Sequence, residues 1–460
     1  MKRKHLNHLL EWKDRSNRKP LIVRGARQVG KTYLIRDFAE QHFENLVELN
    51  LELNPEKAGL FASRDLKEIL RLVELDLDVQ IVPGKTLLFI DEIQRAPELI
   101  GLLRYFFEQM PELHVVAAGS LLEFVLKDHA FSMPVGRVEY LFLGPLDFYE
   151  FLEAMDQSRF VEFLSNFAVG DTIPDSIHQS LLNLVKRYCI VGGMPSAVRE
   201  YRKEENYKVA HMEQTALLQT YRDDFAKYRD KINLRRLQTV FNCLPGLVGE
   251  KLRYVNIDRN ERAKDLNDSL EMLEMARIVY RVKHSSGNGV PLEAESDGKS
   301  FKPLFLDLGL MSASLGLNPV EVSLVEDLLP LFKGAIAEQF AGQQLLYRKN
   351  AYEEPALHYW RREKKGSAAE VDYLIAHGHS VVPVEIKSGK TGTLKSLHVF
   401  VAEKASKLAV RLNMDFPSQC DILPAIKTED RSPYTLLSLP LYLICEIDRL
   451  VEESFNSGTP

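Results

Sequence analysis

The first third of the chain alternates short apolar runs with helical patterns. The runs have the length of buried strands and lie at residues 21–23, 46–51, 86–90, 114–118 and 138–143. Between the third and fourth runs, apolar residues recur at the 3.6-residue spacing of a helix that buries one face, as at Leu99, Leu103 and Phe106. This alternation predicts an α/β fold with a mostly parallel sheet covered by helices on both faces.

The pattern changes along the rest of the chain. Residues 146–230 are helical in pattern, with an interruption at the Gly192-Gly193-Met194-Pro195 turn. The next region predicts short helices followed by a hairpin, an order typical of a winged-helix segment: helices near 234–244 and 266–275, a strand at 278–282 and a Gly/Ser-rich turn at 285–289. The last region predicts a helix at 335–346, strands at 358–361, 370–376 and 381–387, and a helix at 397–412.

The composition narrows the class of protein. A chain of 460 residues exceeds one ordinary core, so we expect two or three domains. Its 27% charged and 9% aromatic residues are typical of a globular protein, and no run approaches the length of a membrane span. The basic start lacks the apolar stretch of a signal peptide, and the four cysteines lack the spacing of a metal site or a disulfide framework. We therefore expect a cytoplasmic protein with reduced thiols and no membrane contact.

A glycine-rich motif follows the first predicted strand. Gly25 to Thr32 form G-x-x-x-x-G-K-T, and a helical pattern begins directly after it. Glycines allow the backbone to curl so that successive N–H groups face a phosphate, helped by the helix N-terminus. We expect Lys31 to reach the β- and γ-phosphates of ATP and the Thr32 hydroxyl to bind Mg²⁺. The predicted nucleotide contacts are Gly25, Ala26, Arg27, Gln28, Val29, Gly30, Lys31, Thr32 and Tyr33.

Two carboxylates end the third predicted strand. Asp91 and Glu92 follow the apolar run Leu-Leu-Phe-Ile. A solvated turn is the plain alternative, but the upstream phosphate loop favours a role for Asp91 in positioning Mg²⁺. Glu92 is placed to orient or deprotonate the attacking water, and this second acid favours hydrolysis over simple nucleotide binding.

Two further residues are candidates for contact with the γ-phosphate. Ser120 follows the fourth predicted strand, where its side chain would sense that phosphate from the neighbouring strand. Arg137 follows Gly136 just before the fifth strand, and a positioned arginine would neutralise charge that develops in phosphoryl transfer. Whether Arg137 acts within its own subunit or on a neighbour, or is a surface arginine, stays open at this stage.

These motifs together resemble a family. GARQVGKT, LLFIDEIQRAPEL, VVAAGS, VGRVEYLFLGPLDFYEFL and YCIVGGMP follow one another as in a group of prokaryotic AAA-type ATPases whose C-terminal domain of unknown function resembles restriction endonucleases. The resemblance covers residues 15–410. It implies a P-loop ATPase core at 1–150, a helical lid at 151–230, a winged-helix-like segment at 231–330 and a PD-(D/E)xK-like α/β domain at 331–450.

The C-terminal region has a second set of chemical groups. Asp372 lies on one predicted strand, and Glu385 and Lys387 lie on the next. Residues two apart on a strand point to the same face, so the latter two side chains would lie together beside Asp372. Two acids and a lysine could hold Mg²⁺ or Mn²⁺ through oxygen ligands and activate water against a phosphodiester. A charged strand face is the plain alternative.

This spacing resembles the D…E-x-K core of the restriction-endonuclease superfamily. Glu338, on the predicted helix upstream, would then correspond to the additional helical acid of that fold. The sequence departs from the superfamily pattern at one point, because Val371 stands where the proline of the PD signature is expected.

The distribution of charge along the chain indicates what kind of partner the protein binds. The whole chain carries a net charge of -6, but residues 222–283 hold 14 Lys/Arg against 10 Asp/Glu, and residues 346–411 hold 12 against 7. Arg361, Arg362, Lys364 and Lys365 cluster beside Tyr359 and Trp360. Such a patch fits the phosphate backbone of DNA, with a solvated face as the alternative.

The sequence thus predicts an Mg²⁺-dependent ATPase coupled to a C-terminal module that binds DNA and is a candidate for cutting it. The rival hypothesis is a nucleotide-dependent switch or DNA-remodelling ATPase whose nuclease-like module only binds DNA or a protein partner. A homo-oligomer is compatible with either.

Overall fold

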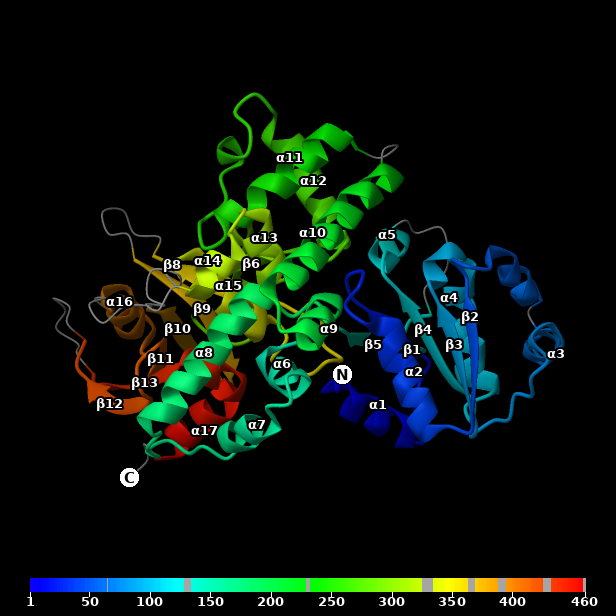
Figure 1. The fold of residues 1–460 in the computed structure, drawn as a ribbon, viewed down its shortest axis with the longest axis horizontal. Helices are drawn as coiled ribbons and strands as arrows, with labels where there is room; N and C mark the ends of the chain where they lie inside the picture. Colours follow the sequence, from blue (N-terminus) through cyan, green and yellow to red (C-terminus); the bar gives the residue numbers. More distant parts are fainter. Residues whose placement is uncertain are drawn as a thin grey trace. The chain divides into compact units, whose positions relative to one another are not determined.

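The computed structural model describes residues 1–63, 65–127, 134–228, 232–324, 334–362, 369–387, 394–424 and 432–457. The chain divides into two compact units (Figure 1). Unit 1 comprises Met1–Pro145 with two short later segments, Met275–Ile278 and Lys349–Pro355. Unit 2 comprises Leu146–Glu274, Val279–Arg348 and Ala356–Pro460.

Unit 1 is built on a five-stranded sheet in which all strands run parallel. Its order is β2-β3-β4-β1-β5, and every pair of neighbours is parallel. The strands are β1 (Leu21–Arg24), β2 (Asn45–Asn50), β3 (Thr86–Asp91), β4 (His114–Gly119) and β5 (Glu139–Phe142). All five strands that the apolar runs predicted are confirmed.

Helices complete unit 1, shown in blue and cyan in Figure 1. They are α1 (His5–Asp14), α2 (Lys31–His42), α3 (Leu66–Leu77), α4 (Glu98–Gln109) and α5 (Leu122–Lys127). Side chains from α3 and α4, such as Ile69 and Phe106, pack with strand residues such as Ile90 in one buried apolar cluster. Helix α4 covers the range that the 3.6-residue spacing predicted.

The parallel sheet brings distant motifs to one edge. Along the registers, Asn50 lies beside Asp91, Asp91 beside Ala118, and Arg24 beside Gly119. The carboxyl ends of β1, β2, β3 and β4 therefore meet, and the residues that follow them share this edge. In open parallel sheets, ligands bind at this edge.

Unit 2 begins with the helices that the sequence predicted for residues 146–230. They are α6 (Phe148–Ala154), α7 (Ser158–Ser165), α8 (Asp175–Val191), α9 (Pro195–Glu204) and α10 (Tyr207–Asp224). The helices that follow are α11 (Leu234–Cys243), α12 (Ala263–Met275), α13 (Leu308–Ser314) and α14 (Pro319–Leu324). A capping box formed by Asp147 and Glu150 fixes the start of α6.

A mixed eight-stranded sheet forms the other layer of unit 2, in the order β12-β13-β11-β10-β9-β8-β6-β7. Its strands are β6 (Val279–Ser285), β7 (Ser296–Phe305), β8 (Leu357–Arg361), β9 (Glu370–His377), β10 (Ser380–Ile386), β11 (Leu408–Asn413), β12 (Ser418–Ile422) and β13 (Tyr434–Pro440). The antiparallel pair β6–β7 is the hairpin predicted after the short helices. Because β6 also pairs in parallel with β8, the sheet continues across residue 330.

One predicted helix in this region is wrong in its second half. Helix α16 (Lys395–Lys404) ends at Ala405, which has a positive φ of 50°. The apolar run that follows is strand β11, whose residues are largely buried between β10 and β13. A continuous apolar run fits a buried strand as well as a buried helix. Nothing in the pattern marked the turn at Ala405 that ends α16. The remaining helices are α15 (Ala335–Leu346), as predicted, and α17 (Ile447–Ser457).

Two further observations concern the whole described chain. Among its helices, none combines the length and apolar character that crossing a bilayer requires. The four cysteines are free thiols, and Cys189 is buried.

Candidate functional site

The glycine-rich loop of unit 1 joins β1 to α2 and depends on its glycines. A Cβ atom at Gly25 would overlap the carbonyl oxygen of Leu143. Gly30 has a φ of 95°, which a side chain rarely permits, and Gln28 also has a positive φ of 64°. The backbone therefore curls at these positions, which is the shape that a loop needs to surround a phosphate with its N–H groups.

Lys31 is buried inside this loop. Its Nζ donates hydrogen bonds to the carbonyl oxygens of Gly25 (3.0 Å) and Ala26 (2.9 Å). Burial lowers the pKa of Lys31 to about 8, against the attraction of Glu92 and Asp91. Its hydrogen-bond partners among the described residues are thus neutral, and they can be exchanged for phosphate oxygens.

Thr32 and Asp91 meet as the sequence predicted. The Thr32 hydroxyl donates to Asp91 Oδ2 at 2.9 Å, and the side-chain amide of Asn50 donates to the same oxygen at 3.3 Å. Burial raises the pKa of Asp91 to about 6, although the hydrogen bond from Thr32 partly lowers it. A hydroxyl and a carboxylate beside a phosphate loop are oxygen donors of the kind that Mg²⁺ prefers, so these residues fit that ion.

Glu92 has a fixed orientation. Its backbone is left-handed, with a φ of 56°. Its Oε2 accepts a hydrogen bond from the Ser120 hydroxyl at 3.1 Å and another from the side-chain amide of Gln94. Ser120 therefore lies at this edge, as predicted, and contacts Glu92. Gln94 was missed, although it follows the two acids by only two or three positions.

Arg137 is not brought to this group of residues. It precedes β5, whose first residue Glu139 pairs with Leu21 at the start of β1. The phosphate loop follows the other end of β1, so Arg137 lies at the opposite edge of the sheet. There its Nε donates to Glu108 Oε1 at 2.8 Å. Of the three alternatives left open, this placement argues against action within the same subunit, and both a surface arginine and action on a neighbouring subunit remain.

The N-terminal segment also contacts the loop, which the sequence did not indicate. The buried guanidinium of Arg3 donates to the carbonyl oxygens of Val29 (2.9 Å) and Gly144 (2.8 Å). The N-terminal amine of Met1 donates to the hydroxyl of Tyr33 at 3.1 Å, and the Tyr33 side chain is otherwise half exposed. Arg3 thus links the phosphate loop to the segment after β5.

A second missed group is a charged cluster in unit 1 next to the phosphate loop. Arg24, the last residue before Gly25, binds the Glu123 carboxylate, with Nε donating to Oε1 at 2.8 Å. Arg277 donates to the same oxygen at 2.8 Å and to Glu354 at 2.9 Å. Arg277 and Glu354 come from the two short later segments of unit 1, which explains why no local motif predicted them.

The second predicted set of residues lies in unit 2, on β9, β10 and α15. Lys387 Nζ lies 2.6 Å from Glu385 Oε1, and the Ile386 N–H donates to Asp372 Oδ2 at 2.8 Å. The other oxygen of Glu385, Oε2, is buried and has no hydrogen-bond partner among the described residues. The predicted residues are thus close together, and one carboxylate oxygen is left unsatisfied.

Two further charged residues belong to this set. The ammonium of Lys302, on β7, lies 2.7 Å from Glu370, 3.4 Å from Glu338 and 3.8 Å from Asp372. We call these residues the acid–lysine cluster: Lys302, Glu338, Glu370, Asp372, Glu385 and Lys387. Lys302 was missed because it lies on a different strand, far from the E-x-K motif in sequence.

The cluster perturbs the ionisation of its members. Burial raises the pKa of Glu338 to about 8 and that of Glu385 to about 7, and the Asp372 carboxylate contributes in both cases. Burial alone would lower the pKa of Lys302, but the neighbouring carboxylates raise it above its ordinary value. The lysine is therefore held in its charged form.

The cluster does not fit a divalent metal as it stands. Within the described residues, no group of three or more His, Cys, Asp or Glu side chains is arranged to hold a metal ion. The Lys302 ammonium lies among three of the four carboxylates, and Lys387 pairs with the fourth. The predicted metal ligands are close together, but their charge is met by two lysines.

The predicted basic patch is only partly described. Lys364 and Lys365 lie outside the described residues. Tyr359 and Trp360 are buried, so their rings are not exposed for stacking on bases. Arg362 pairs with Glu403 at 2.7 Å.

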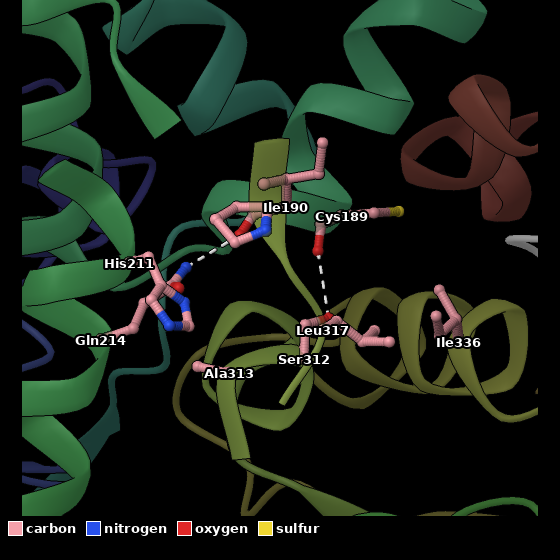
Figure 2. A pocket seen from close by; sticks show the side chains of 9 residues that line it. Cys189, Ile190, His211, Gln214, Ser312, Ala313, Leu317 and Ile336 are labelled. Atoms are coloured by element: carbon pink, nitrogen blue, oxygen red, sulfur yellow. Dashed lines mark hydrogen bonds between the residues drawn. The ribbon is translucent and has the colours of Figure 1, made fainter. Parts of the chain in front are cut away.

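Unit 2 also contains a pocket between α8, α10, α13 and α15 (Figure 2). Two of its polar side chains bond to the backbone: Gln214 donates to the Ile190 carbonyl at 2.8 Å and Ser312 to that of Cys189 at 3.4 Å. None of its lining residues belongs to the acid–lysine cluster.

Comparison with known protein families identifies three regions of the chain. Residues 17–152 match an AAA domain. Residues 182–321 and 333–424 match two domains of unknown function, DUF8612 and DUF4143. The first match agrees with the parallel sheet and the phosphate loop, and the N-terminal region is an AAA-type P-loop ATPase domain. No curated protein sequence matches the chain.

Several solved structures share part of the fold. The Walker-type ATPase PABY2304 of Pyrococcus abyssi is 15% identical, covers 68% of this chain and 95% of its own, and has a TM-score of 0.45. The ORC2 protein of Aeropyrum pernix, in ADPNP–ADP complexes, is 12% identical over 69% and 90%, with a TM-score of 0.32. The RuvB Holliday junction branch migration motor of Thermotoga maritima is 15% identical over 60% and 87%, with a TM-score of 0.29. Likenesses this distant carry no argument about function.

Proposed function

We propose that unit 1 binds ATP with Mg²⁺ and hydrolyses its terminal phosphoanhydride bond. The observation that carries this proposal is the position of the Glu92 carboxylate, which Ser120 and Gln94 hold next to the Thr32–Asp91 pair. A carboxylate fixed at this point can accept a proton from the attacking water. Simple nucleotide binding would not require it.

Each residue of the site has a distinct role in this proposal. The loop N–H groups and Lys31 bind the phosphates, and Thr32 and Asp91 would hold Mg²⁺. When bound, the ion neutralises charge on the β- and γ-phosphates. Ser120 keeps Glu92 oriented. Any action of Arg137 on the nucleotide would require a neighbouring copy in a homo-oligomer, because Arg137 lies at the opposite edge of the sheet from the phosphate loop.

ATP turnover by the Lys31→Ala variant tests the site. We expect loss of both ATP binding and turnover, because the Lys31 ammonium is the group proposed to bind the β- and γ-phosphates. Lys19→Ala, at a partly exposed lysine outside the loop, serves as the control and should behave like the wild type. Undiminished turnover by Lys31→Ala would show that the hydrolytic site lies elsewhere.

We further propose that the ATPase acts together with a DNA-binding module in unit 2, in a cytoplasmic protein. The module resembles a restriction endonuclease in its D…E-x-K spacing, and the segments around it carry excess positive charge. DNA binding should weaken steeply with salt, and DNA should stimulate ATP turnover if the two activities are coupled. Salt-independent binding, or none, would argue instead for a switch that acts on a protein partner.

DNA cleavage by this module is a second candidate function. It is favoured by the pairing of Glu385 with Lys387 and by the buried Oε2 of Glu385, which accepts no hydrogen bond from the described residues. The test is cleavage of single-stranded, duplex and branched DNA with Mg²⁺ or Mn²⁺ by the wild type and by Glu385→Ala. Equal cutting by both proteins would point to a contaminating nuclease.

A further inference from the structure

Lys302 lies where carboxylates from two elements converge. Its side chain is 3% exposed, and its ammonium contacts Glu370, Glu338 and Asp372 at 2.7, 3.4 and 3.8 Å. These acids come from β9 and α15, whereas the lysine comes from β7. A single buried ammonium therefore compensates the charge of three acids that would otherwise repel one another.

The lysine is also held from its other side. Its ammonium lies 5.4 Å from the centre of the Tyr359 ring, within the range of a cation–π contact. The Tyr359 hydroxyl is hydrogen-bonded to Ser300, on the same strand as Lys302, at 2.8 Å. The side chain is thus fixed by a ring as well as by carboxylates, and its position is set by the packing of β7.

A divalent metal at this cluster would need the same oxygens. Such ions bind carboxylates at about 2.0–2.6 Å, so a metal shared by Glu338 and Asp372 would lie within a few ångströms of the ammonium. Two cations at that distance in a buried site repel strongly. The acid–lysine cluster can therefore hold either a divalent metal or the Lys302 ammonium, but not both.

We propose that the ammonium of Lys302 is the built-in cation of the acid–lysine cluster and that it excludes divalent metals from it. The inference rests on the proposed nuclease-like site, since it concerns the same acids. It decides between the two candidate functions of that site. With Lys302 in place the module binds its ligand without metal-dependent hydrolysis, and cleavage requires the ammonium to move away.

Direct measurement of Mn²⁺ binding tests this proposal. The full-length protein is titrated with Mn²⁺ without nucleotide, and free Mn²⁺ is followed by electron paramagnetic resonance. All proteins carry Asp91→Asn, so that the nucleotide site contributes little metal binding. The variant is Lys302→Met, which keeps the length and apolar stem of the side chain but removes its charge. Lys299→Met, exposed on the same strand, is the matched control.

We expect Lys302→Met to bind one Mn²⁺ at least tenfold more tightly than the wild type and Lys299→Met. Adding Glu385→Gln or Asp372→Asn should remove the gain. Equal, tight binding by the wild type and Lys302→Met would overturn the proposal and leave the metal site standing. No binding by either protein would overturn both the proposal and the metal site, whereas the DNA-binding proposal would be judged separately by its salt dependence.

Folding of the variant is checked independently. We expect Mn²⁺ to raise the melting temperature of Lys302→Met by at least about 3 °C at concentrations far above its Kd, and to leave the wild type unchanged. If Lys302→Met does not fold, Lys302→Gln is judged by the same criteria. A tight Mn²⁺ site in the wild type that Glu385→Gln abolishes would overturn the proposal without any lysine variant.

Discussion

Both units contain a buried lysine close to carboxylates, but the two lysines have different partners. Lys31 donates to two neutral backbone carbonyls, and burial lowers its pKa to about 8. Lys302 contacts three carboxylates, which raise its pKa despite its burial. Lys31 can exchange its partners for an anionic ligand at a small cost in free energy. Lys302 could do so only by leaving the charges of three acids uncompensated. Burial of a lysine therefore says little about its role until its partners are known.

The largest expected effect concerns Glu92, an acid near Lys31 that is not its direct partner. Glu92→Gln removes the proton acceptor but keeps the shape, so we expect ATP turnover to fall by about 1,000-fold while ATP binding is retained. Steady-state turnover and nucleotide binding would be measured side by side. Glu98→Gln, exposed at the start of α4, is the control. A loss of binding as large as the loss of turnover would mean that Glu92 is structural.

Removal of the second lysine should affect stability rather than turnover. Lys302→Met leaves buried carboxylates without their cation, and we expect a loss of about 3–5 kcal/mol in the free energy of unfolding of unit 2 at neutral pH. Chemical denaturation without metal would measure it. Lys299→Met should change the value by less than about 0.5 kcal/mol. A loss no larger than that of the control would mean that the acids are already neutral.

The pKa of Lys31 makes ATP affinity depend on pH. Lys31 in the free protein loses its proton as the pH rises through about 8, whereas a lysine bound to phosphate keeps it. Binding above that pH must therefore take up a proton, and we expect affinity to fall by up to about tenfold per pH unit. Titrations between pH 7.5 and 9.5 with a fluorescent ATP analogue would show the slope. Lys31→Arg, which stays charged, should give a flat profile at lower affinity.

The smallest expected effect lies at the edge of the cluster. Glu370 is the nearest acid to Lys302, but about a third of its side chain is exposed. Glu370→Gln leaves the lysine with Glu338 and Asp372, so we expect a loss of about 1 kcal/mol or less in the free energy of unfolding. A loss as large as that of Lys302→Met would show that Glu370 alone compensates the ammonium.

The nucleotide site was largely predictable because its parts are local. A strand, a glycine-rich loop and a helix are contiguous in sequence, and parallel strands necessarily bring their carboxyl ends together. Lys31, Thr32, Asp91, Glu92 and Ser120 therefore meet as expected. Arg3 and Arg277 were missed because neither is near a motif in sequence, and both come close to the phosphate loop only through tertiary packing.

The second cluster was predictable only in part for the same reason. Adjacent strands placed Asp372 near Glu385, but nothing in the sequence marked Lys302 as their neighbour. The strand at Leu408–Asn413 was mistaken for helix because a buried parallel strand has no alternation of polar and apolar residues. Arg137 is the opposite case. Its side chain suits phosphoryl transfer, but the sequence did not show that it lies at the far edge of the sheet from the phosphate loop.

The pairing of β6 with β8 has a practical consequence for any attempt to study the C-terminal region as an isolated fragment. A fragment that starts near residue 334 would lose two strands of its sheet and leave β8 with an open edge, which favours aggregation. It would also lose Lys302 while keeping the acids that this lysine neutralises. If Lys302 excludes divalent metals as proposed, such a fragment should bind them more tightly than the intact protein does, and nuclease activity found in it should be tested again in the full chain.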